Sequence, residues 1–175
     1  MVKFLLLAAF FFSPATGSQS HLIDWKPERK LTWADFQGEP VTGSDNAALT
    51  SSNINFTFGF GSSGFKYSIS CRFDKQRSWV RVKNDHILSH EQGHFDIAEL
   101  HARKLKKALA AYKYRESTVN ADINKLYNDI MAAHHEMQTT YDQQTDHSRK
   151  FDKQAEWLTK IAEELKAMEA YANYK

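Results

Sequence analysis

Two histidines and a glutamate lie close together in the run Ser89-His90-Glu91-Gln92-Gly93-His94, at the spacing H-E-x-x-H. Residues four apart on a helix share one face and lie about 6 Å apart along the axis, so His90 and His94 can bind one tetrahedral Zn²⁺. Glu91 can then reach a zinc-bound water and take its proton. This combination of residues is suited to hydrolysis of a peptide bond.

A catalytic zinc has three protein ligands and one open position, so a third ligand must come from elsewhere in the chain. His101 is excluded, because it lies about 10 Å beyond His94 along a continuous helix. The remaining candidates lie on later segments and are Glu116, His134, His135, Asp142, Asp146 and His147. The polar run 141–147 interrupts the apolar periodicity and is dense in metal-binding groups, which favours His147 or Asp142.

Other side chains near these candidates have two interpretations each. Tyr141 can donate a hydrogen bond to the oxyanion of a tetrahedral intermediate, but it also continues an apolar helical stripe and can pack in the core. Asp142, if it is not a ligand, can orient a ligand imidazole through the second ring nitrogen. Asp96 points away from His94 and is expected to anchor the helix to the sheet. Glu99 and Arg103 are expected to form an exposed ion pair of little energetic weight.

The elements that position these residues change in character near residue 84. Apolar and polar residues alternate over 56–60 and 65–73, which predicts two strands joined by a turn at 61–64, with further strands at 77–83 and 31–36. Apolar residues at helical spacing then predict three helices over 87–112, 119–141 and 151–172. We therefore expect an α+β fold, in which a small antiparallel sheet precedes a zincin-like helix carrying H-E-x-x-H and two further long helices.

The first residues are typical of an export signal. Lys3 precedes an apolar run over 4–12, and the small residues Ala15 and Gly17 fit a signal peptidase site. This run is shorter than the roughly 20 residues that a membrane-spanning helix needs. The sequence thus predicts a signal peptide over 1–17 and one domain over 18–175, β-rich over 18–83 and helical over 84–175. The mature protein is expected to be secreted or periplasmic, without stable membrane insertion.

Composition excludes several classes of function. The chain of 175 residues has 42% hydrophobic and 25% charged residues, the profile of an ordinary globular domain. Its 23 basic and 21 acidic residues give a net charge of +2, which provides no basic patch for nucleic acid. The single cysteine, Cys71, cannot form an internal disulfide or a cysteine-only metal cluster.

Two motifs and their surroundings resemble a known bacterial family. The runs Ser78-Trp79-Val80, Leu88 to Leu100 and Tyr141-Asp142-x-x-Thr145-x-His147 are similar to inferred secreted zinc-dependent proteases whose domain is of unknown function. The motifs of that family are H-E-Q-x-H-F-D and Y-D-x-x-T-x-H-G, and Ser148 stands here in place of the final glycine. The resemblance implies a metallopeptidase-like site with His147 as the third ligand, and it implies no particular substrate.

The sequence as a whole therefore predicts an exported zinc-dependent metallopeptidase that hydrolyses peptide or related amide bonds in a peptide or protein. Its expected catalytic residues are Glu91 and Tyr141, and its expected Zn²⁺ ligands are His90, His94 and His147, with Asp142 as the supporting or alternative ligand. The alternative is a non-catalytic exported binding module, which binds no metal or holds a structural zinc that Asp142 and His147 enclose.

Overall fold

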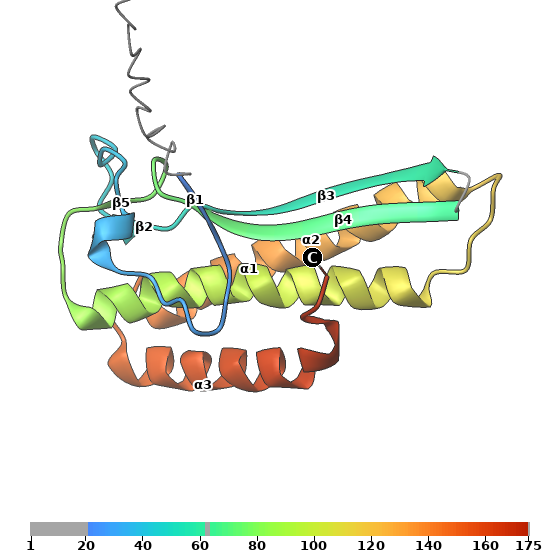
Figure 1. The fold of residues 1–175 in the computed structure, drawn as a ribbon. Helices are drawn as coiled ribbons and strands as arrows, with labels where there is room; N and C mark the ends of the chain where they lie inside the picture. Colours follow the sequence, from blue (N-terminus) through green and yellow to red (C-terminus); the bar gives the residue numbers. More distant parts are fainter. Residues whose placement is uncertain (1–20, 62–63, 175) are drawn as a thin grey trace, which may run out of the picture.

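A computed structural model describes residues 21–61 and 64–174 of the chain. The predicted signal peptide over 1–17 and two residues of the predicted turn, Ser62 and Ser63, lie outside these ranges. The described part has the predicted α+β architecture, with small antiparallel sheets preceding three long helices (Figure 1). None of its helices is both long and apolar enough to cross a membrane.

The main sheet is a long hairpin with one short strand added. Strands β3 (Ser52–Gly61) and β4 (Gly64–Asp74) pair antiparallel along their whole length, and β1 (Leu22–Asp24) pairs with the other side of β4. The order β1-β4-β3 leaves β3 at the edge of the sheet. A second, two-stranded sheet pairs β2 (Ala48–Leu49) with β5 (Trp79–Val80).

Two predicted strands differ in the structure. Within 31–36 the chain forms the 3₁₀ turn η1 (Trp33–Asp35) instead of a strand. The Asp35 carboxylate accepts hydrogen bonds from the Thr32 backbone N–H at 2.7 Å and from the Thr32 hydroxyl at 3.0 Å, and such local bonds compete with strand pairing. The strand predicted over 77–83 is reduced to the two residues of β5.

Three long helices follow, as the apolar spacing predicts. They are α1 (Asp85–Ala111), α2 (Val119–Thr145) and α3 (Phe151–Ala167), with a short 3₁₀ turn η2 (Glu169–Tyr171) near the end of the described chain. Helix α1 begins where the Asn84 side chain accepts a hydrogen bond from the Ile87 N–H at 2.8 Å, as N-cap residues do. Helix α2 continues through 141–145, where the sequence predicted a break.

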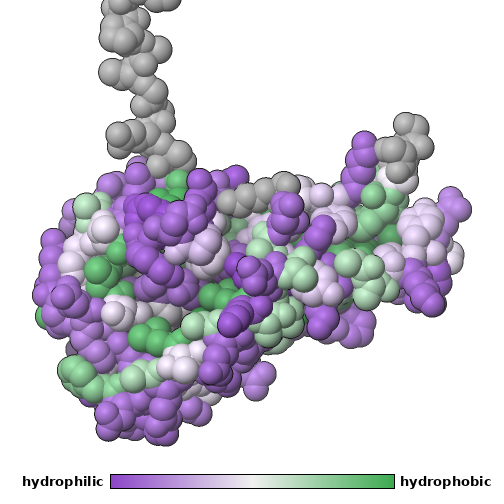
Figure 2. All heavy atoms as spheres, turned by 60° about the horizontal axis from the view of Figure 1, so that its bottom comes forward, coloured by the Kyte–Doolittle hydropathy of each residue, from purple (hydrophilic) through white to green (hydrophobic). Residues whose placement is uncertain are grey.

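Helix α1 is the central element. It contacts the hairpin β3–β4 on one side and α2 and α3 on the others (Figure 1). The core forms where Ile69 and Phe73 of β4 meet Phe95 and Leu105 of α1, all fully or almost fully buried. Hydrophilic residues cover most of the face on which α3 lies (Figure 2). Because α1 is covered by the hairpin, α2 and α3, few of its side chains can be exposed.

The surroundings of α1 decide the positions of two predicted groups. Trp25 Nε1 and Gln92 Nε2 donate hydrogen bonds to Asp96 Oδ1 at 2.7 and 2.8 Å. Asp96 therefore anchors α1, as predicted, but to the segment that follows β1 and not to a strand of the sheet. The predicted surface pair of Glu99 and Arg103 is wrong, because both residues are buried. Arg103 Nε donates to Glu99 Oε1 at 2.8 Å inside the protein.

Candidate metal centre

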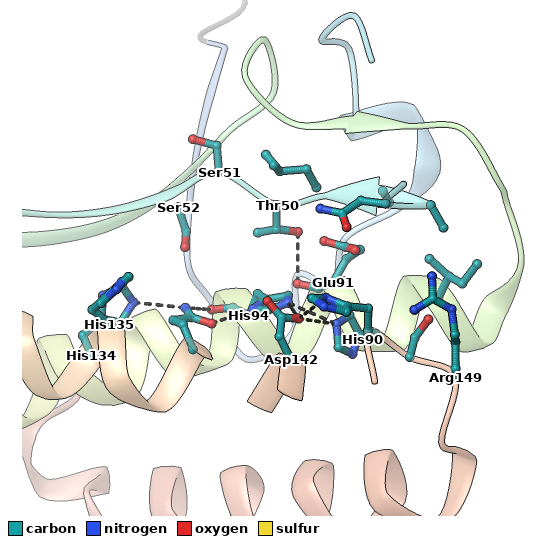
Figure 3. A pocket seen from close by; sticks show the side chains of 18 residues that line it. Thr50, Ser51, Ser52, His90, Glu91, His94, His134, His135, Asp142 and Arg149 are labelled. Carbon is teal, nitrogen blue, oxygen red and sulfur yellow. Dashed lines mark hydrogen bonds and ion pairs between the residues drawn. The ribbon is translucent and has the colours of Figure 1, made fainter. Parts of the chain in front are cut away.

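Helix α1 directs His90 and His94 toward α2, where they meet Asp142. The Nε2 atoms of the two histidines lie 3.1 Å apart, and Asp142 Oδ1 lies 3.1 Å from each of them. Figure 3 shows the three side chains converging from the two helices. The three atoms form an equilateral triangle, and these residues form a group that could hold a metal ion.

The size of this triangle suits a small divalent cation. Around a tetrahedral Zn²⁺ with bonds of about 2.0–2.1 Å, neighbouring ligand atoms lie about 3.3 Å apart. The observed 3.1 Å separations approach that value without any movement of the helices. Two imidazole nitrogens and one carboxylate oxygen are also a known catalytic donor type, comparable to two histidines and one glutamate. The donors present are therefore of a type that could hold a divalent metal ion.

The three residues of the metal-binding group differ in charge at neutral pH. Burial lowers the pKa of His90 to about 4, so this imidazole is neutral at neutral pH. Burial acts in the same direction on His94, but the hydrogen bond to Asp142 and the negative charge of Glu91 outweigh it and raise the pKa to about 9. Burial favours neutral Asp142, yet the hydrogen bonds with His90 and His94 lower its pKa. In the absence of a metal, a proton on His94 balances the charge of Asp142.

His147 lies beside this group and not within it. It follows the end of α2, where Asp146, His147 and Ser148 have φ values of 50°, 50° and 71°. Its side chain is 49% exposed, and its Nδ1 atom lies 3.6 Å from Asp142 Oδ1. Asp142, and not His147, completes the group with His90 and His94. A role for His147 as a metal ligand stays a prediction.

Tyr141 lies behind the histidines. It is fully buried, its ring stacks on His90 with centroids 4.5 Å apart, and its hydroxyl donates to the backbone carbonyl of His90 at 3.3 Å. The close approach requires Gly93, because a Cβ atom at that position would lie 2.5 Å from Tyr141 Oη. These contacts are those of a packing residue, and they give no support to the predicted oxyanion role.

Glu91 is buried beside the group with one oxygen unpaired. Its residue is 4% exposed, and its Oε2 atom has no hydrogen-bond partner among the described residues. Burial raises the pKa of the Glu91 carboxyl. The Thr50 hydroxyl donates to the Glu91 backbone carbonyl at 3.2 Å, which ties this turn of α1 to the segment before β3. A buried carboxylate oxygen without a partner is destabilising, and a hydrogen bond from a ligand bound beside it would relieve that cost.

The metal-binding group, Glu91 and His147 border one pocket of about 700 Å³, whereas Tyr141 does not line it. The segment 46–52 forms one wall, and α1 supplies His90, Glu91 and His94 (Figure 3). Helix α2 and the connection after it supply the opposite wall, which comprises His134, His135, Gln138, Asp142, His147, Ser148 and Arg149. The metal-binding group is thus open to a ligand of substantial size.

The other candidate ligands are distributed around the pocket or lie away from it. His134 and His135 line it without joining the metal-binding group, while Glu116 does not line it. Asp146 lies 3.5 Å from Arg149 in an exposed ion pair. These positions leave Asp142 as the one carboxylate among the predicted ligands that meets both histidines.

The sequence comparison defines the family of the chain. Residues 27–148 match a bacterial family of unknown function, DUF922. The chain belongs to this family. The DUF922 match contains every residue of the metal-binding group as well as Glu91, His147 and Ser148. No curated protein and no solved structure matches the chain significantly.

Within the DUF922 segment, sequence reasoning missed Thr50, Gly93 and Gln138. Gln138 had a recognisable signal, since His134, Gln138 and Asp142 are spaced by four residues and share one face of a helix. A glycine inside a helix, as at position 93, likewise indicates a close approach of another side chain. Thr50 had no comparable signal, because its contact with α1 joins segments 41 residues apart.

Proposed function

We propose that this protein is an exported zinc-dependent metallopeptidase that cleaves peptide or related amide bonds. The observation that carries the proposal is the 3.1 Å triangle of His90, His94 and Asp142, open to a large pocket beside the unpaired Glu91 Oε2. His90 Nε2, His94 Nε2 and Asp142 Oδ1 would hold the ion. When bound, Zn²⁺ acidifies a water and polarises a carbonyl oxygen.

Glu91 would act as the general base that transfers the proton. The carboxylate would accept a proton from the attacking water and pass it to the leaving amide nitrogen, which balances the hydrolysis. Its buried position excludes competing hydrogen bonds from bulk water, and the adjacent Thr50 contact holds this part of α1 in place. No other carboxylate that lines the pocket is available, because Asp142 belongs to the proposed ligand set.

The wall formed by 46–52 favours an extended peptide as substrate. Within the described residues β2 pairs on one side only, with β5, and β3 lies at the sheet edge. Backbone groups along such an edge can pair with a peptide strand, which is a common mode of peptide recognition. The edge lies across the pocket from the histidines of α1 (Figure 3). A peptide bound there would place a backbone amide beside the metal-binding group.

The second candidate is an exported binding module with a structural zinc. Its basis is the 3.6 Å separation of His147 Nδ1 and Asp142 Oδ1, which places a fourth donor close to the group. Four protein ligands would close the site to water. The two candidates therefore differ in whether His147 binds the metal.

The deciding experiment combines metal analysis with a peptide-library cleavage assay on the mature protein. We expect one zinc per chain and cleavage of a subset of peptides. Glu91→Gln should keep the zinc and lose turnover, because an amide cannot accept the proton. Glu136→Gln, at an exposed position of α2, is the matched control. Cleavage by the Glu91→Gln protein at the parental rate would refute the assigned role, and stoichiometric zinc without cleavage of any peptide would favour the binding module.

A further inference from the structure

Gln138 connects the metal-binding group to a second layer of side chains. It lies on α2 one turn before Asp142, and its amide has three partners. Its Oε1 atom lies 2.6 Å from His94 Nδ1, and its Nε2 atom lies 2.9 Å from the His94 backbone oxygen and 3.0 Å from His134 Nε2. One side chain therefore contacts both the ring and the backbone of a proposed ligand.

These partners determine which way the amide points. The backbone oxygen of His94 can only accept, so the group that faces it at 2.9 Å must be the N–H₂ end of Gln138. The second N–H of that end is directed to His134 Nε2. The oxygen end then faces His94 Nδ1, and a flipped amide would place two oxygens against each other. The His94 ring must donate from Nδ1 to Gln138.

This hydrogen bond gives the two ring nitrogens different roles, because Nδ1 keeps its hydrogen whether the ring is neutral or protonated, and a metal at Nε2 replaces the proton shared there with Asp142 Oδ1. With hydrogen held on Nδ1, the electron pair that can bind a metal is on Nε2, the atom that lies 3.1 Å from both His90 Nε2 and Asp142 Oδ1. We propose that Gln138 is the positioning residue that holds His94 with its Nδ1 protonated and its Nε2 directed into the metal-binding group. The inference rests on the proposed function, since it concerns that same group.

The two histidines are held by different means, which makes the proposal specific. His90 Nδ1 has no hydrogen-bond partner among the described residues, and the ring is held by stacking on Tyr141 with an interplanar angle of 18°. His94 contacts the Tyr141 ring only edge-on, at 73°. A change at Gln138 should therefore affect His94 and leave the hold on His90 intact.

Gln138 could instead have a merely structural role, in which its replacement only weakens the packing of α2 against α1. Its N–H₂ end also links α2 to the backbone of α1, and loss of that link alone would loosen the helix pair. Gln138→Glu separates the two roles, because a carboxylate still accepts from His94 Nδ1 but cannot donate to the His94 carbonyl oxygen. Gln138→Leu removes both. Gln143→Leu, at an exposed position on the same helix, is the matched control.

The experiment measures zinc affinity by competition with a chelating indicator for the wild-type protein and the three variants. Loss of a hydrogen bond that orients a ligand typically weakens metal binding about 10–100-fold, and we expect this for Gln138→Leu. Gln138→Glu should stay within about threefold of the wild type, because it keeps the acceptor. Urea unfolding of the metal-free proteins measures the loss of the helix link separately.

A second measurement needs no metal. In the NMR spectrum of the metal-free wild-type protein, the His94 Nδ1–H should appear as a proton protected from exchange, and it should be lost in Gln138→Leu and retained in Gln143→Leu. Equal zinc affinity of Gln138→Leu and Gln143→Leu, or equal losses for Gln138→Leu and Gln138→Glu, would overturn the inference and leave the proposed function standing. If the wild-type protein binds no zinc, the proposed function fails, and the assignment of Gln138 then depends on this resonance alone.

Discussion

Replacing Asp142 should cost the protein far more zinc affinity than replacing His147. Asp142 Oδ1 lies 3.1 Å from the Nε2 atoms of both histidines, the separation expected of ligand atoms on one ion, whereas His147 lies outside that group. Protein zinc sites of four ligands bind with about 10–16 kcal/mol, or about 2.5–4 kcal/mol per ligand. At 1.4 kcal/mol per tenfold, Asp142→Ala should lose about 10²–10³-fold in affinity.

The effect of His147→Ala should be much smaller. Its Nδ1 atom lies 3.6 Å from Asp142 Oδ1, and its side chain is 49% exposed, so it can at most orient the carboxylate from outside. A residue of that kind contributes about 10–100-fold when its contact is tight. We expect about tenfold or less at this distance and exposure.

The assay is a zinc titration of metal-free protein against a competing chelator at one pH. Asp129→Ala, a substitution at an exposed aspartate of the same helix, and His135→Ala, which removes a pocket-lining histidine outside the group, are the matched controls. Both should bind zinc like the wild type. If His147→Ala loses zinc while Asp142→Ala retains it, the ligand assignment drawn from the triangle is refuted and the order implied by the family motifs is correct.

Three further predictions concern stability, measured by urea unfolding. Gly93→Ala should destabilise the protein by about 1–3 kcal/mol despite the helix preference of alanine, because its Cβ would lie 2.5 Å from Tyr141 Oη; unchanged stability would contradict this packing. Ser148→Gly should stabilise it by about 1 kcal/mol, because φ of 71° is costly for serine and not for glycine; a loss would show that the serine side chain outweighs this strain. Asp35→Asn should destabilise it at pH 7, because hydrogen bonds from Arg29 and Thr32 overcome the effect of burial and lower the Asp35 pKa below 3.8. A lowered pKa adds stability above 3.8 that is lost as pH falls through the folded value, so the difference between Asp35→Asn and wild type should shrink at pH 3, and a constant difference would refute the linkage.

The predictable part of the fold is the part with regular periodicity. The hairpin β3–β4 and the three helices follow from alternation and from three- and four-residue steps, because each of those patterns places apolar side chains on one face of a regular element. The segment 31–36 has apolar residues too, but the Asp35 side chain bonds to Thr32 and closes a turn there. A hydropathy pattern does not reveal local hydrogen bonds of this kind.

Burial of charge was the hardest feature to foresee. Glu99 and Arg103 are four residues apart on α1, the usual spacing of an exposed pair, and nothing in that spacing shows that another element covers them. In the structure Arg103 Nη1 also donates to the Leu165 carbonyl near the end of α3, and its guanidinium lies 5.0 Å from the Trp25 ring. These contacts join distant segments, so they depend on the packing of the whole domain.

In the candidate site, too, the relations within one helix are predictable from the sequence, and those between helices are not. His90, Glu91 and His94 lie on one helix, so their relation follows from helical geometry alone. Their meeting with Asp142 depends on how α1 packs against α2, across 52 and 48 residues of chain, and the sequence could reduce the choice only to Asp142 or His147. The spacing of His134, Gln138 and Asp142 by four places them on one face of α2, and in the structure Gln138 and Asp142 of this face contact His94 of α1.

The backbone segments that carry Asp142 and His147 give a physical reason to favour Asp142 as the ligand. A metal site needs donors held to within a few tenths of an ångström, and regular helices hold side chains more closely than connections do. Asp142 lies within α2, one turn after Gln138, whose amide is bonded to the His94 backbone at 2.9 Å. His147 follows the helix end on three successive residues of positive φ, with a half-exposed side chain. A donor on such a connection is better suited to contact a substrate or the Asp142 carboxylate than to set the geometry of the ion, and the helices alone already supply the three ligands that an open, catalytic zinc requires.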